Sequence, residues 1–384
     1  MKKPSTLKLV AFSLLPLAVL LSSAELVIRA FELDQPAILA GGSSTGSTYV
    51  QPDIHLGWSL KPNSTGDAGW GKRAVINSIG LRSPEIGAKK PGEFRILSLG
   101  ESTTFGTNVK NDETYSTQLQ EILSAQLPSR PISVINAGVS AYSSYQSLKY
   151  LERRGLALKP DVVLFYHEVN DYLPSSIRDT KLNEVGVLRT DKQLYDSGLA
   201  RVDAVIRKHS ALYRLLSRAY ANFRIERLDL EDFKNPVRKI GLPPELRVSG
   251  FIRRIEHPGE PDDALDAAAL GRRVSDSERL ENLQHLASIC RENQIELIII
   301  HPSYAHSKPH ECLLTGFCRD EGVRMFEAYP SLHPGGVARS VMFLDWWHPS
   351  ARGHRRLAEG LAQFIEEHLL SERQDQTVDS RPAH

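Results

Sequence analysis

The sequence predicts an α/β protein of three layers, in which helices cover both faces of a doubly wound, mostly parallel sheet. Short apolar runs rich in Val, Ile and Leu recur at residues 94–99, 132–135, 162–166 and 295–300. Continuous runs of this length are typical of strands that are buried on both faces of a parallel sheet. Helical patterns lie between the runs, and such alternation favours right-handed strand–helix–strand crossovers.

Two of the helical patterns are well defined. Residues 113–127 place Leu119, Ile122 and Leu123 on one face, as an amphipathic helix does. The segment "SARGHRRLAEGLAQFIEEHLL", residues 350–370, predicts the final helix of the domain. The last residues, 373–384, are polar and are expected to form a disordered tail.

A charged segment at residues 174–275 interrupts this alternation of strands and helices. It contains one amphipathic helical pattern, "SALYRLLSRAYANF", and a turn-rich stretch, "EHPGEPDD". We interpret it as a helical insertion at the strand ends and not as an independent domain. The sequence therefore predicts one domain over residues 61–372 that contains this insertion.

The N-terminal segment has the pattern of an export signal. Lys2, Lys3 and Lys8 come before an uncharged apolar run at residues 9–24. Residues 1–33 fit either a cleaved signal peptide or a retained membrane anchor, so membrane association through this segment stays open. Either reading places the rest of the chain outside the cytoplasm, because lysines favour the inner side. Residues 34–60, rich in Gly and Ser, are expected to be a linker.

The composition argues against nucleic acid as a partner, and the cysteines allow one disulfide. The chain has 47 basic and 46 acidic residues, so no global basic field would attract nucleic acid. An exported protein can form disulfides, and Cys312 and Cys318 are close enough in sequence to pair. Cys290 would then be a buried thiol. The histidines near residues 301–310 are irregularly spaced, and we expect no metal site there.

Polar residues follow the apolar runs, where the ligand of an open α/β sheet binds. Ser102 comes just after the first run, and a serine needs an adjacent base to act as a nucleophile. His348 can be this base, because imidazole titrates near neutral pH. Asp345, three residues earlier, can bind the other ring nitrogen and stabilise the imidazolium.

An acyl-transfer site also needs donors for the oxyanion of its tetrahedral intermediate. The backbone N–H of Ser102 is one candidate, because it would lie at a helix N-terminus. Gly138 follows the second apolar run and can bring a second N–H close, since it has no side chain. Asn170 follows the third run, and its side-chain amide can be the third donor.

The stretches "GEST", "NAG", "VND" and "DWWHP", in this order, resemble the four blocks of the SGNH, or GDSL-like, hydrolases. The resemblance covers about residues 50–172 and 290–370. It implies a flavodoxin-like fold and the following site: Ser102 as nucleophile, Gly138 and Asn170 as oxyanion donors, and Asp345 with His348 completing the triad. Two positions depart from the family pattern, namely Glu101 in place of aspartate and His167, Glu168 and Val169 before Asn170.

Together these features predict an exported or membrane-anchored serine esterase that needs no metal or organic cofactor. Its substrate would be an ester, such as an O-acyl group on an extracytoplasmic glycan. Two alternatives stay open, an O-acyltransferase with the same residues and a catalytically silent envelope protein that binds a ligand. His167 could line the pocket or be structural. Of Trp346 and Trp347, one is expected in the core and the other as a pocket wall.

Overall fold

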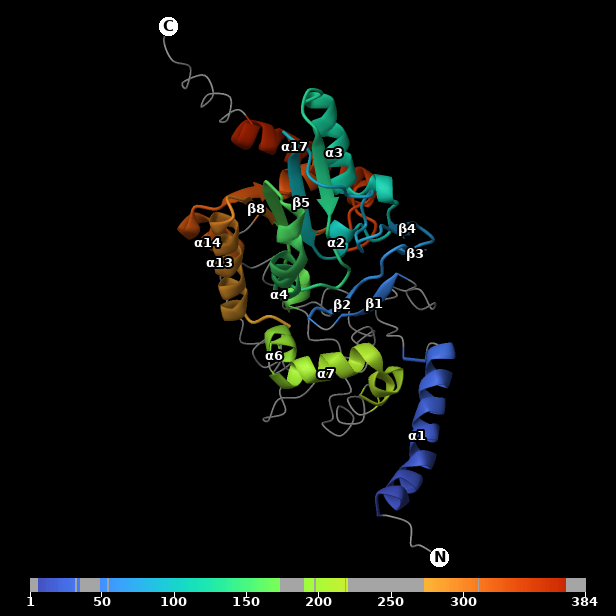
Figure 1. The fold of residues 1–384 in the computed structure, drawn as a ribbon. Coiled ribbons are helices and arrows are strands. Elements are labelled where there is room, and N and C mark those ends of the chain that lie inside the picture. Colours follow the sequence, from blue (N-terminus) through green and yellow to red (C-terminus); the bar gives the residue numbers. More distant parts are fainter. Residues whose placement is uncertain are drawn as a thin grey trace, which may run out of the picture.

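The protein is described by a computed structural model. It covers residues 6–31, 33–34, 49–53, 55–172, 190–196, 198–217, 219, 273–309 and 311–370. Figure 1 shows a central sheet with helices on both sides, and a long N-terminal helix that extends away from this body. The tail expected at 373–384 and most of the insertion lie outside the described residues.

The central sheet confirms the predicted fold class. It has five strands in the order β6-β5-β7-β8-β9, and all neighbouring pairs are parallel. In chain order within the sheet this is 2-1-3-4-5, the flavodoxin-like arrangement, whose ligand crevice lies between the first and third strands. The strands are β5 (Phe94–Gly100), β6 (Ile132–Asn136), β7 (Val162–Tyr166), β8 (Glu296–His301) and β9 (Arg324–Glu327).

Alternate residues of the strands point to opposite faces of the sheet, and each face buries its own apolar core. On one face, residues such as Ile96 and Leu164 pack against α3 (Tyr115–Gln126) and α17 (Ala351–Ile365). On the other, residues such as Leu97 and Phe165 form part of a second core. The helices of that face are α4 (Ser144–Tyr150), α13 (Asp276–Glu292) and α14 (Leu313–Glu321).

Two antiparallel hairpins precede the sheet. They are formed by β1 (Val50–Asp53) with β2 (Gly57–Leu60), and by β3 (Ser64–Asp67) with β4 (Arg73–Ile76). Leu56 and Leu60 are buried in the same core as α4 and α13. The prediction of a linker over 34–60 is therefore wrong for its last residues, because they bury apolar side chains against the domain.

Short helices connect the larger elements, several of them at the carboxyl edge of the sheet. The α-helical ones are α2 (Ser102–Phe105), α5 (Val169–Tyr172), α15 (Tyr329–Leu332) and α16 (Arg339–Met342). The tighter or wider turns are η2 (Asn111–Glu113), η3 (Leu151–Gly155), η4 (Leu156–Leu158) and η5 (Glu366–Leu370). Ser350 caps α17, accepting a hydrogen bond from the N–H of Gly353.

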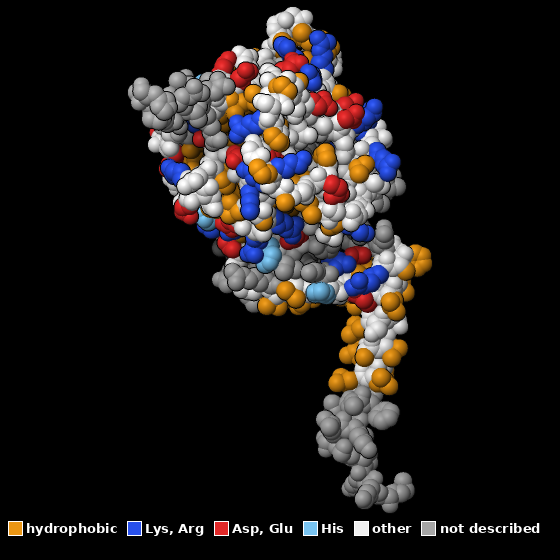
Figure 2. All heavy atoms as spheres, turned by 45° about the horizontal axis from the view of Figure 1, so that its top comes forward, with side chains coloured by type: hydrophobic (Ala, Val, Ile, Leu, Met, Phe, Trp, Pro, Cys, Tyr) orange, Lys and Arg blue, Asp and Glu red, His pale blue; other side chains and the backbone are white. Residues whose placement is uncertain are grey.

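The described part of the predicted insertion includes α6 (Asp191–Tyr195) and α7 (Gly198–His209). The N-terminal segment forms α1 (Thr6–Ala30), whose described apolar side chains are largely exposed (Figure 2). Glu25 of α1 accepts hydrogen bonds from the backbone N–H groups of Ala211 and Leu212. In the described part of the chain, no helix is both long enough and apolar enough to cross a lipid bilayer.

The three cysteines form no disulfide. Cys290 is buried on α13, as expected, and burial raises the pKa of its thiol to about 12. The pair that could have formed, Cys312 and Cys318, lies at the start and within α14. There the helix separates the two side chains by one and a half turns or more, so the structure does not bring them together as a disulfide.

Candidate active site

The chain turns sharply at the end of β5, and this turn presents Ser102. Gly100 is the last residue of the strand and Ser102 is the first of α2. A Cβ atom at Gly100 would lie 2.0 Å from Thr104 Oγ1, so a larger residue would not fit without a shift. Ser102 is partly exposed while Thr103 and Thr104 are buried. Only the first of the three hydroxyl residues is therefore open to a substrate.

Ser102, His348 and Asp345 form a continuous hydrogen-bonded series. Ser102 Oγ lies 2.9 Å from His348 Nε2, and His348 Nδ1 lies 2.7 Å from Asp345 Oδ2. The carboxylate can only accept from Nδ1–H, so Nε2 carries the lone pair that faces the serine hydroxyl. Ser102 and His348 are 246 residues apart in the chain. This arrangement is suited to remove a proton from Ser102.

Asp345 is fixed within its own turn. Its Oδ1 accepts hydrogen bonds from the backbone N–H groups of Trp347 and His348, both at 2.8 Å. Burial raises the pKa of Asp345, but these bonds and the one from the His348 ring outweigh it and hold the pKa below its ordinary value. The spacing of three residues predicted from sequence therefore brings the carboxylate onto the correct ring nitrogen.

Asn170 lies beside the turn of Ser102, at the start of α5. Its side-chain Nδ2 donates to the carbonyl oxygen of Tyr142 at 3.1 Å, and the second hydrogen of the amide is left over for another acceptor. Its backbone N–H donates to Glu101 Oε2 at 3.2 Å. Glu101, the residue before Ser102, thus holds Asn170 in place. This contact lies at the ends of β5 and β7, the two strands at the switch point of the sheet.

Gly138 has a packing role that the sequence did not indicate. Its N–H donates to the side chain of Asn136 at 3.0 Å. A Cβ atom at this position would lie 2.3 Å from the backbone nitrogen of Phe105 and 2.6 Å from the carbonyl carbon of Thr104. The glycine lets α2 approach the end of β6 closely. Its N–H is already used, so the expectation that it serves the oxyanion does not fit this geometry.

Another backbone N–H of the same loop, that of Ala141, is a candidate oxyanion donor. Ala141 lies three residues after Gly138. Ala141 has a φ of 63°, in the left-handed region that is unusual for alanine. No hydrogen bond found among the described residues uses its N–H. The next residue, Tyr142, is the one whose carbonyl binds Asn170. Nothing in the sequence marks this position, because alanine is not a residue that typically adopts a left-handed conformation.

Two distant segments hold the loop that contains Ala141. From the N-terminal hairpin, the carbonyl oxygen of Trp58 accepts a hydrogen bond from the Tyr142 hydroxyl at 2.6 Å. From the end of the insertion, Arg273 donates to the carbonyl oxygen of Ala141 and also pairs with Asp191 at 2.8 Å. Arg273 and Asp191 are both buried. The described ends of the predicted insertion thus contact the loop next to the site.

Buried carboxyl groups lie behind Ser102. Glu101 is 1% exposed, and burial together with the charge on Asp171 raises its pKa well above the ordinary value. Asp171 is itself buried and pairs with Arg279, its Oδ2 lying 3.2 Å from the arginine Nε. Arg279 also donates to the carbonyl oxygen of His167 at 2.9 Å. Asp171 thus has a cation beside it, whereas burial and the charge on Asp171 favour the neutral form of Glu101.

The remaining candidate residues, His167, Trp346 and Trp347, contact other side chains of the fold. His167 is buried and lies 2.7 Å from Ser147 Oγ, and burial holds its pKa well below the ordinary value, so it supports the fold. Neither tryptophan is in the core, since both are only partly buried. Trp347 packs edge-on against Tyr304, and Trp346 stacks on His306. The expectation of one core tryptophan is therefore wrong.

No family model matches the sequence, and no curated protein matches it. Solved structures do resemble it. A putative lipolytic protein of the G-D-S-L family from Desulfitobacterium hafniense is 10% identical, with a TM-score of 0.35 over 70% of this chain and 98% of that one. Axe2, an acetylxylan esterase from Geobacillus stearothermophilus, is 14% identical, with a TM-score of 0.40 over 73% and 96%.

A third solved structure is a two-domain esterase active on acetylated mannans. It is 14% identical, with a TM-score of 0.38 over 72% of this chain and 50% of that one.

Proposed function

We propose that the protein is a serine esterase in which Ser102 is the nucleophile, His348 the general base and Asp345 its orienting carboxylate. One observation carries this proposal, the contact of 2.9 Å between Ser102 Oγ and His348 Nε2 with Asp345 on the opposite ring nitrogen. Ser102 attacks the ester carbonyl and His348 takes its proton. His348 then protonates the leaving alcohol and activates the water that hydrolyses the acyl-enzyme.

The oxyanion of the intermediate would be stabilised by three donors, the N–H groups of Ser102 and Ala141 and the amide of Asn170. Support for Ala141 is its unused N–H and its position next to Tyr142, which binds Asn170. Gly138 is set aside because its N–H donates to Asn136. Each such donor contributes about 100- to 1000-fold to the rate in enzymes of this kind.

The substrate class follows from the sequence and not from a pocket. The four blocks resemble SGNH hydrolases, and the N-terminal segment has the pattern of an export signal. Both favour an extracytoplasmic ester, such as an O-acyl group on a glycan of the cell envelope. No contact around Ser102 favours transfer of the acyl group to a second sugar over transfer to water.

A fluorophosphonate probe tests the nucleophile, because it labels only serines activated by a base. We expect the folded protein to be labelled and the Ser102→Ala variant to be unlabelled. Ser288→Ala is the matched control, since Ser288 Oγ is exposed and contacts the carboxylate of Glu292 at 2.8 Å but no histidine. An unlabelled wild-type protein with native circular dichroism would exclude the esterase and leave a ligand-binding role.

A product assay separates hydrolysis from transfer. The protein is incubated with an acyl ester in the absence and the presence of a soluble glycan, and the free acid and the acylated glycan are measured. An esterase releases free acid at the same rate in both conditions. Acylated glycan that forms at the expense of free acid would identify an acyltransferase.

A further inference from the structure

A second group of reactive side chains lies at the same edge of the sheet, two strands away from Ser102. β8 ends at His301 and β9 ends at Glu327, and these two residues are partners in the strand register. His301 Nδ1 lies 2.7 Å from Glu327 Oε2, and His301 Nε2 lies 3.4 Å from Cys312 Sγ. A thiol, an imidazole and a carboxylate from three separate elements thus form one series, in the same order as in a thiol nucleophile with its base.

Cys312 occupies the N-cap position of α14. Its backbone N–H donates to Thr315 Oγ1 at 2.8 Å, which fixes the first turn of the helix. The positive end of a helix dipole stabilises an anion at this position, and so does an adjacent imidazolium. Two independent features of the fold therefore favour the thiolate of Cys312 over its thiol.

The imidazole of His301 is arranged to stay charged. Its side chain is 4% exposed, whereas that of Glu327 is 47% exposed. Burial alone would lower the pKa of His301, but its hydrogen bonds to Cys312 and Glu327 outweigh burial and raise the pKa to about 10. The other charged groups that face this pair are Glu168, after β7, and Arg279, on α13.

The geometry is that of a relay and not of a metal site. The two ring nitrogens of His301 face different partners, so the sulfur and the carboxylate cannot bind one ion together with a single nitrogen. Among the described residues, no group of three or more His, Cys, Asp or Glu side chains is arranged to hold a metal ion. A proton-transfer role is therefore the chemistry that these three groups support.

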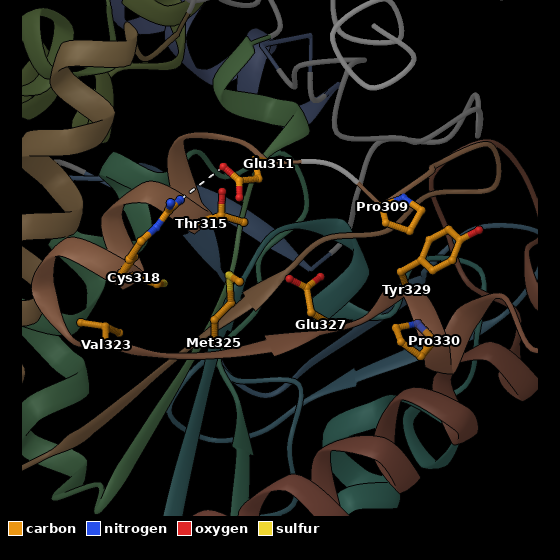
Figure 3. A pocket seen from close by; sticks show the side chains of 10 residues that line it. Pro309, Glu311, Thr315, Cys318, Val323, Met325, Glu327, Tyr329 and Pro330 are labelled. Atoms are coloured by element: carbon orange, nitrogen blue, oxygen red, sulfur yellow. Dashed lines mark hydrogen bonds and ion pairs between the residues drawn. The ribbon is translucent and has the colours of Figure 1, made fainter. Parts of the chain in front are cut away.

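A pocket beside this series gives a small molecule room to approach. Its volume is about 870 Å³, and its lining includes Glu311, Thr315, Cys318 and Glu327 but neither Cys312 nor His301. Figure 3 shows the carboxylates of Glu311 and Glu327 at this pocket, the first paired with Arg319. Glu327 binds His301, and Glu311 and Thr315 are near Cys312 in the chain, so the pocket reaches the carboxylate end of the series and the helix turn that begins at Cys312.

We propose that Cys312 and His301, oriented by Glu327, form a thiolate–imidazolium pair and that Cys312 is a site of covalent modification by small disulfides. The Cys312 sulfur attacks one sulfur of the disulfide, so that a new S–S bond forms and the original one breaks. Cys312 is oxidised to a mixed disulfide and the other half of the reagent is reduced to a thiolate. This thiolate takes up the proton that His301 received from Cys312.

The wild-type protein with 4,4′-dithiodipyridine tests this proposal, with peptide mass spectrometry to assign the modified cysteine. At pH about 6.5 an ordinary thiol is roughly 1% ionised, so a paired thiolate gains up to about 100-fold in reactive form. Part of this gain is lost because a less basic thiolate is a weaker nucleophile. We expect Cys312 to react about 10- to 30-fold faster than in the His301→Gln variant.

Internal and matched controls accompany this measurement. Burial raises the pKa values of Cys290 and Cys318 to about 12, so both should react far more slowly than Cys312, although Cys318 lines the pocket. Glu327→Gln removes the carboxylate on His301 and should slow Cys312 several-fold. Glu311→Gln is the matched control. It removes a carboxylate that lines the same pocket but pairs with Arg319 and not with His301, so it should leave the reaction rate of Cys312 unchanged.

Two results would overturn the proposal. One is a native protein in which Cys312 is not modified. The other is a Cys312 rate that rises through pH about 8.5, as for an ordinary thiol, and is the same in wild type and in Glu327→Gln. The second comparison decides even where His301→Gln does not fold, because Glu327 is half exposed and its glutamine variant removes only a charge.

Discussion

The guanidinium group of Arg273 donates a hydrogen bond to the carbonyl oxygen of Ala141, although 132 residues separate them in the chain. Arg273 is held in turn by the buried carboxylate of Asp191. Ala141 carries the N–H that we propose as an oxyanion donor. The described ends of the insertion, at Asp191 and Arg273, therefore help to position a group of the candidate active site that lies outside the insertion.

Replacing Arg273 by methionine should lower kcat about 10- to 100-fold with a smaller change in KM. The loop would lose the contact that orients Ala141, and the loss of a whole donor costs about 100- to 1000-fold. The variant also leaves Asp191 buried without its cation, which should lower the free energy of unfolding by about 3 kcal/mol. Steady-state kinetics on a chromogenic ester and urea unfolding measure the two effects.

Lys192→Met is the matched control for this variant. It removes an exposed ion pair at 2.7 Å to Glu281 that joins α6 to α13 without contacting the loop. Exposed pairs contribute at most about 1 kcal/mol, so both kcat and stability should stay close to wild type. A parental kcat for Arg273→Met would contradict the positioning role of the arginine.

The two positions considered as oxyanion donors should respond differently to exchange of Gly and Ala. Gly138→Ala should lower the free energy of unfolding by about 1–3 kcal/mol, because its Cβ would overlap the backbone of Phe105. Ala141→Gly should change stability by less than about 1 kcal/mol and kcat only a few-fold. Here relief of the left-handed strain offsets the greater freedom of glycine in the unfolded chain. Urea unfolding of Gly138→Ala at wild-type stability would refute the packing role of Gly138.

Glu101→Gln should keep kcat within about threefold of wild type. Burial favours the neutral form of this carboxyl group, and a glutamine of the same shape can still accept the hydrogen bond from the N–H of Asn170. Glu101→Ala removes this acceptor and leaves a cavity, so kcat and stability should both fall, the latter by about 2–4 kcal/mol. Equal losses in the two variants, measured on the same ester, would show that Glu101 acts as a carboxylate.

The effect of Glu101→Gln on the free energy of unfolding should depend on pH. The pKa of Glu101 is raised in the folded protein, so its stabilising contribution is present at low pH and declines once the unfolded chain ionises, above pH about 4.3. The Glu101→Gln variant does not lose stability in this way, because glutamine does not ionise. Its stability relative to wild type should therefore rise with pH above that point, by up to about 1.4 kcal/mol per pH unit. Urea unfolding from pH 4 to 8 measures this difference, and a constant difference would refute the raised pKa.

Asp345→Asn should lower kcat by about 1000- to 10,000-fold and leave the fold intact. The asparagine oxygen can still accept from the N–H groups of Trp347 and His348, but its NH₂ donates to His348 Nδ1. The imidazole then carries its proton on Nε2 and cannot accept one from Ser102. Labelling by the fluorophosphonate probe should slow in parallel with kcat. An Asp345→Asn protein of undiminished activity would exclude the orienting role of the carboxylate.

Sequence patterns predicted the sheet well where both faces of a strand are buried. The four predicted apolar runs correspond to β5, β6, β7 and β8 within one or two residues. β9, one of the two edge strands of the sheet, was missed because only Phe326 of its four residues is buried. An edge strand of "RMFE" has no apolar run for a pattern to detect, and its register is set by pairing with β8.

The sequence by itself determined the order of the blocks and the residue types that a nucleophile, a base and a carboxylate require. Ser102, Asp345 and His348 were predicted from local spacing because each follows a strand or lies within one turn. Only the tertiary structure decided what the backbone does. In the folded chain the N–H of Gly138 donates to Asn136, Ala141 has a left-handed conformation, and Arg273 donates to the carbonyl oxygen of Ala141. The physical reason is that a backbone N–H has no side-chain signature, and its direction depends on contacts between segments far apart in the chain.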